Sequence, residues 1–265
     1  MESVLFLVFV AGLALVCEYI DSALGGGYGT ILTPILLILG LDKAMVVPAI
    51  LITEFFTGII SAIMHHRAGN ANFTLEIDRN LNKKALLISQ DAKIAIILGI
   101  FGVLGGVVAA LVAINIPAAI VNTYIGILVT MVGLLVLLNF KWKFSWAKIV
   151  GIGLLAAFNK GMSGGGYGPL VSSGQIVTDR NPKQAVASTS LSEAAVCAGA
   201  LIIYILTKTF PFNFQFVLAL LAGALSSVPF AVLTVKKIQV EKFQPLVGII
   251  TCGLGVWTLV KTWSF

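Results

Sequence analysis

The sequence predicts an all-α membrane protein made of two inverted repeats, with six full spans and two broken or re-entrant helical hairpins, in about 8–10 helical segments. Three observations lead to this prediction. Only 11% of the 265 residues are charged and 58% are hydrophobic, whereas a soluble domain keeps about a quarter of its residues charged. Apolar runs of about 20 residues recur along the chain. A glycine motif also recurs, at a fixed spacing.

Seven segments are apolar for long enough to cross a ~30 Å hydrocarbon core as helices. They are 4–24, 44–64, 94–114, 118–139, 185–206, 214–235 and 243–260. A further apolar region, 148–178, is interrupted by glycine. Because the first segment follows Met-Glu rather than basic residues and is long for a secretory signal, we expect it to stay in the mature protein.

The basic residues indicate the orientation of these segments. With the loop 65–93 placed in the cytoplasm, alternation through the spans puts 13 of the 17 lysine and arginine residues on that side and three outside. Because lysine and arginine are enriched in cytoplasmic loops, both termini are expected to be external, in a bacterial inner (plasma) membrane. The basic residues report topology and share no face, so nucleic acid is not expected as a partner.

A repeated motif relates the two halves of the chain. GGGYG occupies 25–29 and again 164–168, and the same spacing of 139 residues carries Glu54 onto Glu193 without a gap. A lone acid inside an apolar segment that repeats with the motif is unlike a chance match. The whole chain is therefore interpreted as a duplication.

The boundaries of the duplication follow from the loops. The first repeat covers 1–139, a basic cytoplasmic linker covers 140–147, and the second repeat covers 148–265. The segment 44–64 runs inward and its counterpart 185–206 runs outward, so the repeats are inverted. Secondary transporters commonly have inverted repeats, with the substrate bound near the middle of the membrane where the repeats meet.

Each glycine motif is predicted to break a helix inside the membrane. A first arm of about 16–21 residues leads to the glycines, and a second arm of about 11 residues would be ~16 Å long as a helix, too short to span. Backbone N–H groups freed by such a turn, at the start of a short helix, make a site for an anion. Close packing of helices on small residues is the alternative reading.

The predicted substrate-binding residues lie at the two glycine turns and beside them. They are Gly25, Gly26, Gly27, Tyr28, Lys160, Ser163, Gly164, Gly165, Gly166, Tyr167, Thr189 and Ser190. Lys160 supplies a positive charge for the anion, or instead pairs with an acid such as Glu193 or Asp21. The hydroxyl-rich segment 188–192 either lines the path or bonds back to helix carbonyls.

The predicted coupling or gating residues are the buried acids Glu54, Glu193 and Asp21. A charged carboxylate facing lipid costs about 2.5–3.5 kcal/mol, so these acids should face the interior. One reading is that they bind a coupling ion, H⁺ or Na⁺. The other is structural, with the acids hydrogen-bonded to the unwound glycine backbone.

Other classes of function find little support. Three scattered cysteines lack metal-ligand spacing, and neither a nucleotide-binding motif nor a nucleophile with a base is visible. No catalytic residue, cofactor or metal is therefore predicted, and an anion channel of the same architecture is the nearest alternative to a carrier, ahead of a membrane-embedded enzyme. A homodimer is suggested by the small-residue face at Gly99, Gly102, Gly105 and Gly106.

Two segments of the second half carry a family resemblance. Residues 161–170 read GMSGGGYGPL and residues 182–190 read PKQAVASTS, which resembles the TauE/SafE sulfite-exporter family. The resemblance extends over the chain through the duplication, although the first half lacks the hydroxyl-rich segment. It implies a carrier that exports sulfite or an organosulfonate such as sulfoacetate. The sulfur chemistry comes from the resemblance alone.

Overall fold

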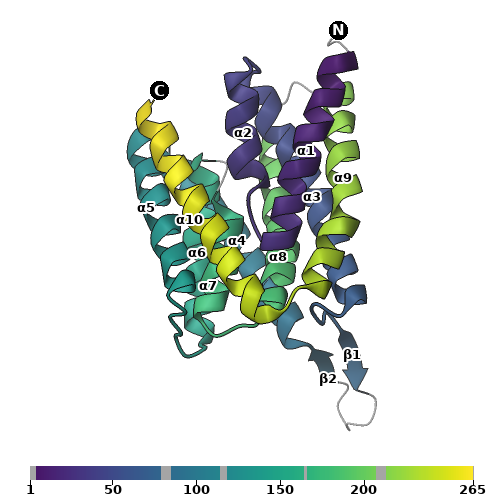
Figure 1. The fold of residues 1–265 in the computed structure, drawn as a ribbon, viewed down its shortest axis with the longest axis vertical. Coiled ribbons are helices and arrows are strands. Elements are labelled where there is room, and N and C mark those ends of the chain that lie inside the picture. The colour runs from purple at the N-terminus through teal and green to yellow at the C-terminus, as the bar shows by residue number, and fades with distance from the viewer. Residues whose placement is uncertain (1–3, 79–84, 114–117, 164–165, 207–212, 265) are drawn as a thin grey trace.

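The computed structural model describes residues 4–78, 85–113, 118–163, 166–206 and 213–264. Ten helices and one β-hairpin make up these residues (Figure 1). The helices are α1 (Val4–Leu24), α2 (Tyr28–Ile38), α3 (Lys43–Ala68), α4 (Gln90–Ala113), α5 (Ala118–Leu137), α6 (Trp146–Ser163), α7 (Tyr167–Val177), α8 (Pro182–Leu206), α9 (Phe214–Lys237) and α10 (Val240–Ser264). Both termini lie at one end of the bundle, the terminal end, and the hairpin lies at the other, the hairpin end.

The helices have the length and surface of membrane spans. Five stretches in the described residues are long and apolar enough to cross a bilayer: Val4–Leu24, Met45–Ala68, Pro182–Leu206, Phe214–Lys237 and Val240–Trp263. Large apolar side chains such as Ile100 and Phe230 point outward, 55% and 66% exposed. Because an exposed apolar exterior of this kind is covered by lipid, the chain is a multi-pass membrane protein.

The predicted breaks at the glycine motifs are confirmed. Gly25, Gly26 and Gly27 have φ of 80°, 158° and 145°, and Gly166 has φ 78°, all in a region that side chains other than glycine rarely adopt. These turns separate α1 from α2 and α6 from α7. The helices α2 and α7 have 11 residues each, about 16 Å at 1.5 Å per residue, so neither spans the membrane. They lie in opposite ends of the bundle, α2 at the terminal end and α7 at the hairpin end (Figure 1).

The helices pair in a pattern that is unchanged when the halves are exchanged. Helix α1 packs along α9 as α6 packs along α4, and α3 packs against α9 as α8 packs against α4. Two further contacts each join a helix to its counterpart in the other half, α3 to α8 and α5 to α10. Glycines allow the last contact: a Cβ on Gly126 would lie 3.0 Å from the carbonyl oxygen of Gly255.

The glycines assigned to a dimer surface have another role. A Cβ on Gly99 would lie 3.0 Å from Ala195 Cβ, and one on Gly105 would lie 3.1 Å from Ala157 Cβ. Gly102 faces Val196 in the same way. Since these three glycines pack α4 against α8 and α6 of the same chain, they do not form the free face that a second copy would need, and the homodimer itself stays a prediction.

The loop 65–93 contains structure that the all-α prediction missed. Helix α3 continues to Ala68, and strands β1 (Leu75–Asp78) and β2 (Ala85–Ile88) form an antiparallel hairpin. Its base is tied to α4, because Asn72 N donates to Asp91 Oδ2 at 2.7 Å. Four-residue strands give too little alternation to be recognised among polar residues.

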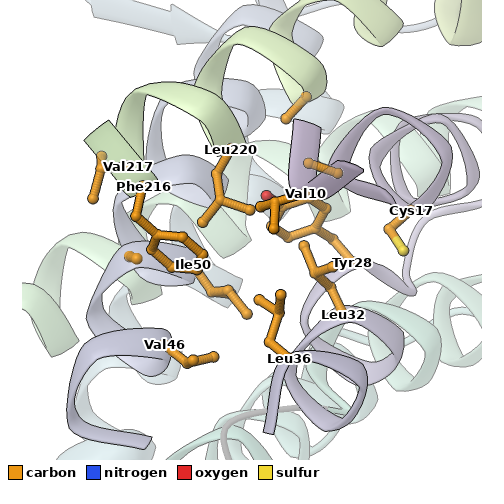
Figure 2. Packing of buried hydrophobic residues seen from close by; sticks show 13 residues of the cluster. Val10, Cys17, Tyr28, Leu32, Leu36, Val46, Ile50, Phe216, Val217 and Leu220 are labelled. Atoms are coloured by element: carbon orange, nitrogen blue, oxygen red, sulfur yellow. The ribbon is translucent and has the colours of Figure 1, made fainter. Parts of the chain in front are cut away.

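The terminal end has an apolar core between α1, α2, α3 and α9. Tyr28, Leu36 and Ile50 pack there against Phe216 and Leu220 (Figure 2). All five are 2% exposed or less. The terminal side of the bundle is therefore closed by hydrocarbon side chains.

Candidate functional site

The three buried charges predicted from the sequence meet at one point. Lys160 Nζ, from α6, donates to Glu54 Oε2 of α3 at 2.8 Å and to Glu193 Oε1 of α8 at 2.7 Å. The three side chains are only 4–8% exposed. The two acids that the repeat relates therefore hold one lysine between them. Of the two readings of Lys160, an anion ligand or the partner of an acid, the structure shows the second, with both acids as partners.

The first glycine turn is capped by carboxylates. Tyr28 N donates to Asp21 Oδ1 at 3.0 Å, and Gly29 N donates to Glu54 Oε1 at 3.2 Å. A helix begins with N–H groups that lack partners inside the helix, and carboxylates near its N-terminus also interact favourably with the helix dipole. The N–H groups expected to bind an anion at the start of α2 are thus bound by two side chains of the protein itself.

The two glycine turns touch. A Cβ on Gly168 would lie 2.6 Å from Gly26 Cα and 2.9 Å from the carbonyl oxygen of Gly25. Gly166 N donates to Thr30 Oγ1 at 3.2 Å, which adds a hydrogen bond between the halves. Gly164 and Gly165, and the side chain of Ser163, lie outside the described residues. In the part that is described, the broken helices of the two halves meet in direct backbone contact.

A narrow acidic pocket lies next to this contact. Its lining residues are Glu18, Asp21, Glu54, Thr57, Gly58, Ser190 and Glu193. The space between them does not admit a water-sized sphere. Four carboxyl groups therefore line this pocket, and two of them, those of Glu54 and Glu193, bind the ammonium group of Lys160. No group of three or more metal-ligating residues is positioned to hold a metal ion within the described part of the chain.

Sequence reasoning missed Glu18. Its side chain is 1% exposed and accepts hydrogen bonds from Ser22 Oγ at 2.6 Å and Thr57 Oγ1 at 3.1 Å. The residue 139 positions later is Ala157, so the repeat gave no signal for it. Its spacing of three residues from Asp21, which puts both acids on one helix face, could have revealed it.

Of the remaining predicted side chains, some line the pocket and others do not. Tyr28 points into the apolar core of Figure 2. The hydroxyl of Tyr167 donates to Ser192 Oγ at 3.1 Å, outside the pocket lining. Thr189 and Ser190 both bond back to helix carbonyls, as one reading allowed, and Ser190 also lines the pocket. Neither tyrosine therefore lines the pocket in this conformation, and their role in substrate binding stays a prediction.

Comparison with known proteins agrees with this architecture. The model of a family described as "Sulfite exporter TauE/SafE" matches residues 9–77 and 82–258. A curated relative, "Probable membrane transporter protein YtnM" of Bacillus subtilis (strain 168), is 24% identical over 272 residues, which cover 97% of this chain and 84% of the relative. The match includes both glycine turns, Lys160 and the two paired acids. The chain therefore belongs to the sulfite exporter TauE/SafE family of membrane transporters.

Proposed function

We propose that the protein is a secondary transporter that exports a small sulfur-containing anion, sulfite or an organosulfonate such as sulfoacetate, across the bacterial inner membrane. The observation that carries the proposal is Lys160 held between Glu54 and Glu193, where the broken helices of both halves meet. Family membership supports the class of substrate. The symmetric pairing of the helices supports alternating access by rocking of one repeat against the other.

The closed geometry suggests how transport is coupled. An anion that binds Lys160 must compete with two carboxylates, and the N–H groups of α2 are held by Asp21 and Glu54 as well. Protonation of Glu193 removes its negative charge and frees part of the ammonium group for the anion. Anion and proton then favour each other's binding, as reciprocal coupling requires.

The pH dependence of binding tests this coupling. We expect the affinity of purified protein for sulfite or sulfoacetate to rise as the pH falls, because protons compete with Lys160 for the carboxylate of Glu193. Glu193→Gln should tighten binding at neutral pH about tenfold and flatten the pH dependence, since one charged hydrogen bond to Lys160 is lost. Isothermal titration calorimetry across pH 5–8 measures both effects. Glu241→Gln, at an exposed acid of α10, is the matched control.

Flux into proteoliposomes tests the transport class. Labelled sulfite and sulfoacetate should accumulate with an imposed proton gradient, saturate with concentration and show counterflow. Flux that never saturates and shows no counterflow would instead favour the channel alternative. A response to a sodium gradient alone would indicate that Na⁺ rather than H⁺ is the coupling ion. Covalent change of the substrate by the purified protein would favour a membrane-embedded enzyme.

The orientation has its own test. A cysteine at Leu75, 60% exposed on the hairpin, should react with an impermeant reagent only from the cytoplasmic side. A cysteine at Trp263, 72% exposed near the C-terminus, should react only from outside. The native cysteines Cys17 and Cys197 are buried and give little background. The reverse pattern would place both termini in the cytoplasm and refute the predicted topology.

A further inference from the structure

The two ends of the bundle are closed by different chemistry. At the hairpin end, α7, α8 and the turn between them contribute buried polar side chains, namely Gln175, Arg180, Ser188 and Thr189. The residues 139 positions earlier are all apolar: Leu36, Leu41, Ala49 and Ile50. Leu36, Ala49 and Ile50 belong to the apolar core of the terminal end, and Leu41 packs against it; Figure 2 shows Leu36 and Ile50. At these four pairs of positions, a charged guest therefore meets hydrogen-bonding side chains at the hairpin end and apolar ones at the terminal end.

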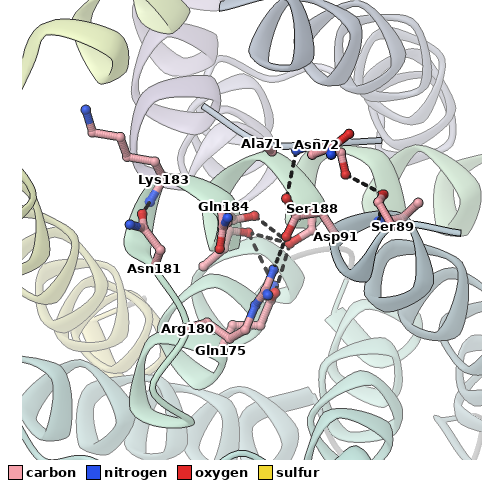
Figure 3. A network of polar contacts seen from close by, with 12 residues as sticks. Ala71, Asn72, Ser89, Asp91, Gln175, Arg180, Asn181, Lys183, Gln184 and Ser188 are labelled. Atoms are coloured by element: carbon pink, nitrogen blue, oxygen red, sulfur yellow. Dashed lines mark hydrogen bonds and ion pairs between the residues drawn. The ribbon is translucent and has the colours of Figure 1, made fainter. Parts of the chain in front are cut away.

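Arg180 is the charged member of this polar region. Its Nη2 donates to Asp91 Oδ1, and both side chains are nine-tenths or more buried, at 6% and 4% exposed. Its Nε is also buried and has no hydrogen-bond partner among the described residues. Figure 3 shows the guanidinium pointing toward Asp91 and Ser188. A buried donor without a partner costs free energy, so a second acceptor at this position would be stabilising.

Polar groups connect Arg180 to the central pocket. Its backbone N donates to Gln175 O at 3.1 Å. The side chain of Gln175 donates through Nε2 to Thr189 Oγ1 at 3.1 Å. The next residue of α8, Ser190, lines the pocket itself. Hydrogen-bonding residues of α7 and α8 thus lie between Arg180 and the acids around Lys160.

We propose that Arg180 is an oxyanion-binding site at the hairpin-end entrance, where a sulfur oxyanion takes the place of Asp91 before it moves to Lys160. The proposal rests on the transport function proposed above and adds a second anion site to it. A guanidinium donates two parallel N–H groups to two oxygens of one anion, and the unpartnered Nε completes that fork beside Nη2.

The exchange of one anion for another leaves no buried cation alone. While the guest is bound, Arg180 keeps a negative partner, and Asp91 Oδ2 still accepts from Asn72 N at 2.7 Å. The carboxylate of Asp91 therefore competes with the substrate for the guanidinium of Arg180, and the substrate must displace it to bind there. Its pseudo-equivalent at the terminal end, 122 positions later, is the uncharged Asn213, which caps α9.

Binding to the purified protein in detergent tests the site with sulfite, sulfoacetate and sulfate as probes. Asp91→Asn should tighten binding about tenfold, because the competing charge is removed while the amide keeps an acceptor for Asn72 N. The neutral pair Arg180→Gln with Asp91→Asn should weaken binding about tenfold or more relative to Asp91→Asn alone. Calorimetry measures both, and the melting temperature of each variant without anion reports its folding.

The control is a second ion pair at the same end of the bundle. Lys141 and Asp179 lie 3.2 Å apart and are 38% and 64% exposed, so Lys141→Gln with Asp179→Asn changes the same kinds of charge without touching Arg180. This pair should bind as the wild type does. No loss of affinity in the Arg180→Gln pair relative to Asp91→Asn alone, or no tightening in Asp91→Asn relative to the wild type, would overturn the proposal. If the variants behave as expected but no anion crosses proteoliposomes, the site stands and the transport function fails.

Discussion

Lys160→Ala is expected to abolish anion flux and to lower the free energy of unfolding by about 3–5 kcal/mol, the usual cost of removing one partner of a buried ion pair. The reason is that Glu54 and Glu193 would be left close together in a site 4–8% exposed, with no positive charge between them. Unfolding in mixed micelles measures the stability, and flux into proteoliposomes measures the transport.

A neutral replacement separates the two effects. Lys160→Met combined with Glu54→Gln and Glu193→Gln removes all three charges, and such replacements of buried ion pairs are often neutral or stabilising. We expect this triple variant to unfold within about 1 kcal/mol of the wild type and still to move no anion. Flux in the triple variant near the wild-type rate would show that the charged cluster is structural and that the substrate crosses elsewhere.

The sequence was informative about the central site because the duplication marked it. Glu54 and Glu193 stood out as acids in apolar segments at equivalent positions, and the glycines marked where each helix must break. Which partner Lys160 takes could not be read in advance, because three acids lay within reach of an unknown turn geometry. The structure gives it two partners and uses the third acid, Asp21, to cap α2.

The residues that sequence reasoning missed are those whose burial depends on a turn. Arg180 was counted as a loop charge that reports topology. After α7, however, Asp179 adopts φ 65° and Arg180 N returns to Gln175 O, which directs its side chain back toward the bundle. No periodicity in the sequence encodes that reversal. The same holds for Asp91, whose burial depends on the hairpin that precedes α4.

The difference between the two ends bears on direction. In the proposed transport, the buried polar side chains between Arg180 and the pocket and the apolar core at the other end would favour loading of an anion from the hairpin side. Release on the terminal side then requires the apolar core around Phe216 and Leu220 to open, which is the kind of movement that rocking of α1 and α9 against the rest would produce. An exporter whose hairpin is cytoplasmic has this arrangement.

The contact between the two glycine turns gives the second large effect. Gly168→Ala should lower the free energy of unfolding by about 1–3 kcal/mol and reduce flux below detection. The new Cβ would lie 2.6 Å from Gly26 Cα, so backbone rather than a flexible side chain must move, and 3.2 Å from Glu193 Oε2, which displaces a partner of Lys160. Measurements of stability and flux on the same preparation test both parts.

Gly12→Ala is the matched control for this substitution, because a Cβ built on Gly12 in α1 meets nothing within 4 Å. It should leave flux unchanged and stabilise the helix by up to about 1 kcal/mol, the difference in helix propensity between the two residues. Wild-type flux in Gly168→Ala would mean that the turns can separate without loss of function. The binding site would then not depend on their contact, and the placement of the anion between the two halves would have to be abandoned.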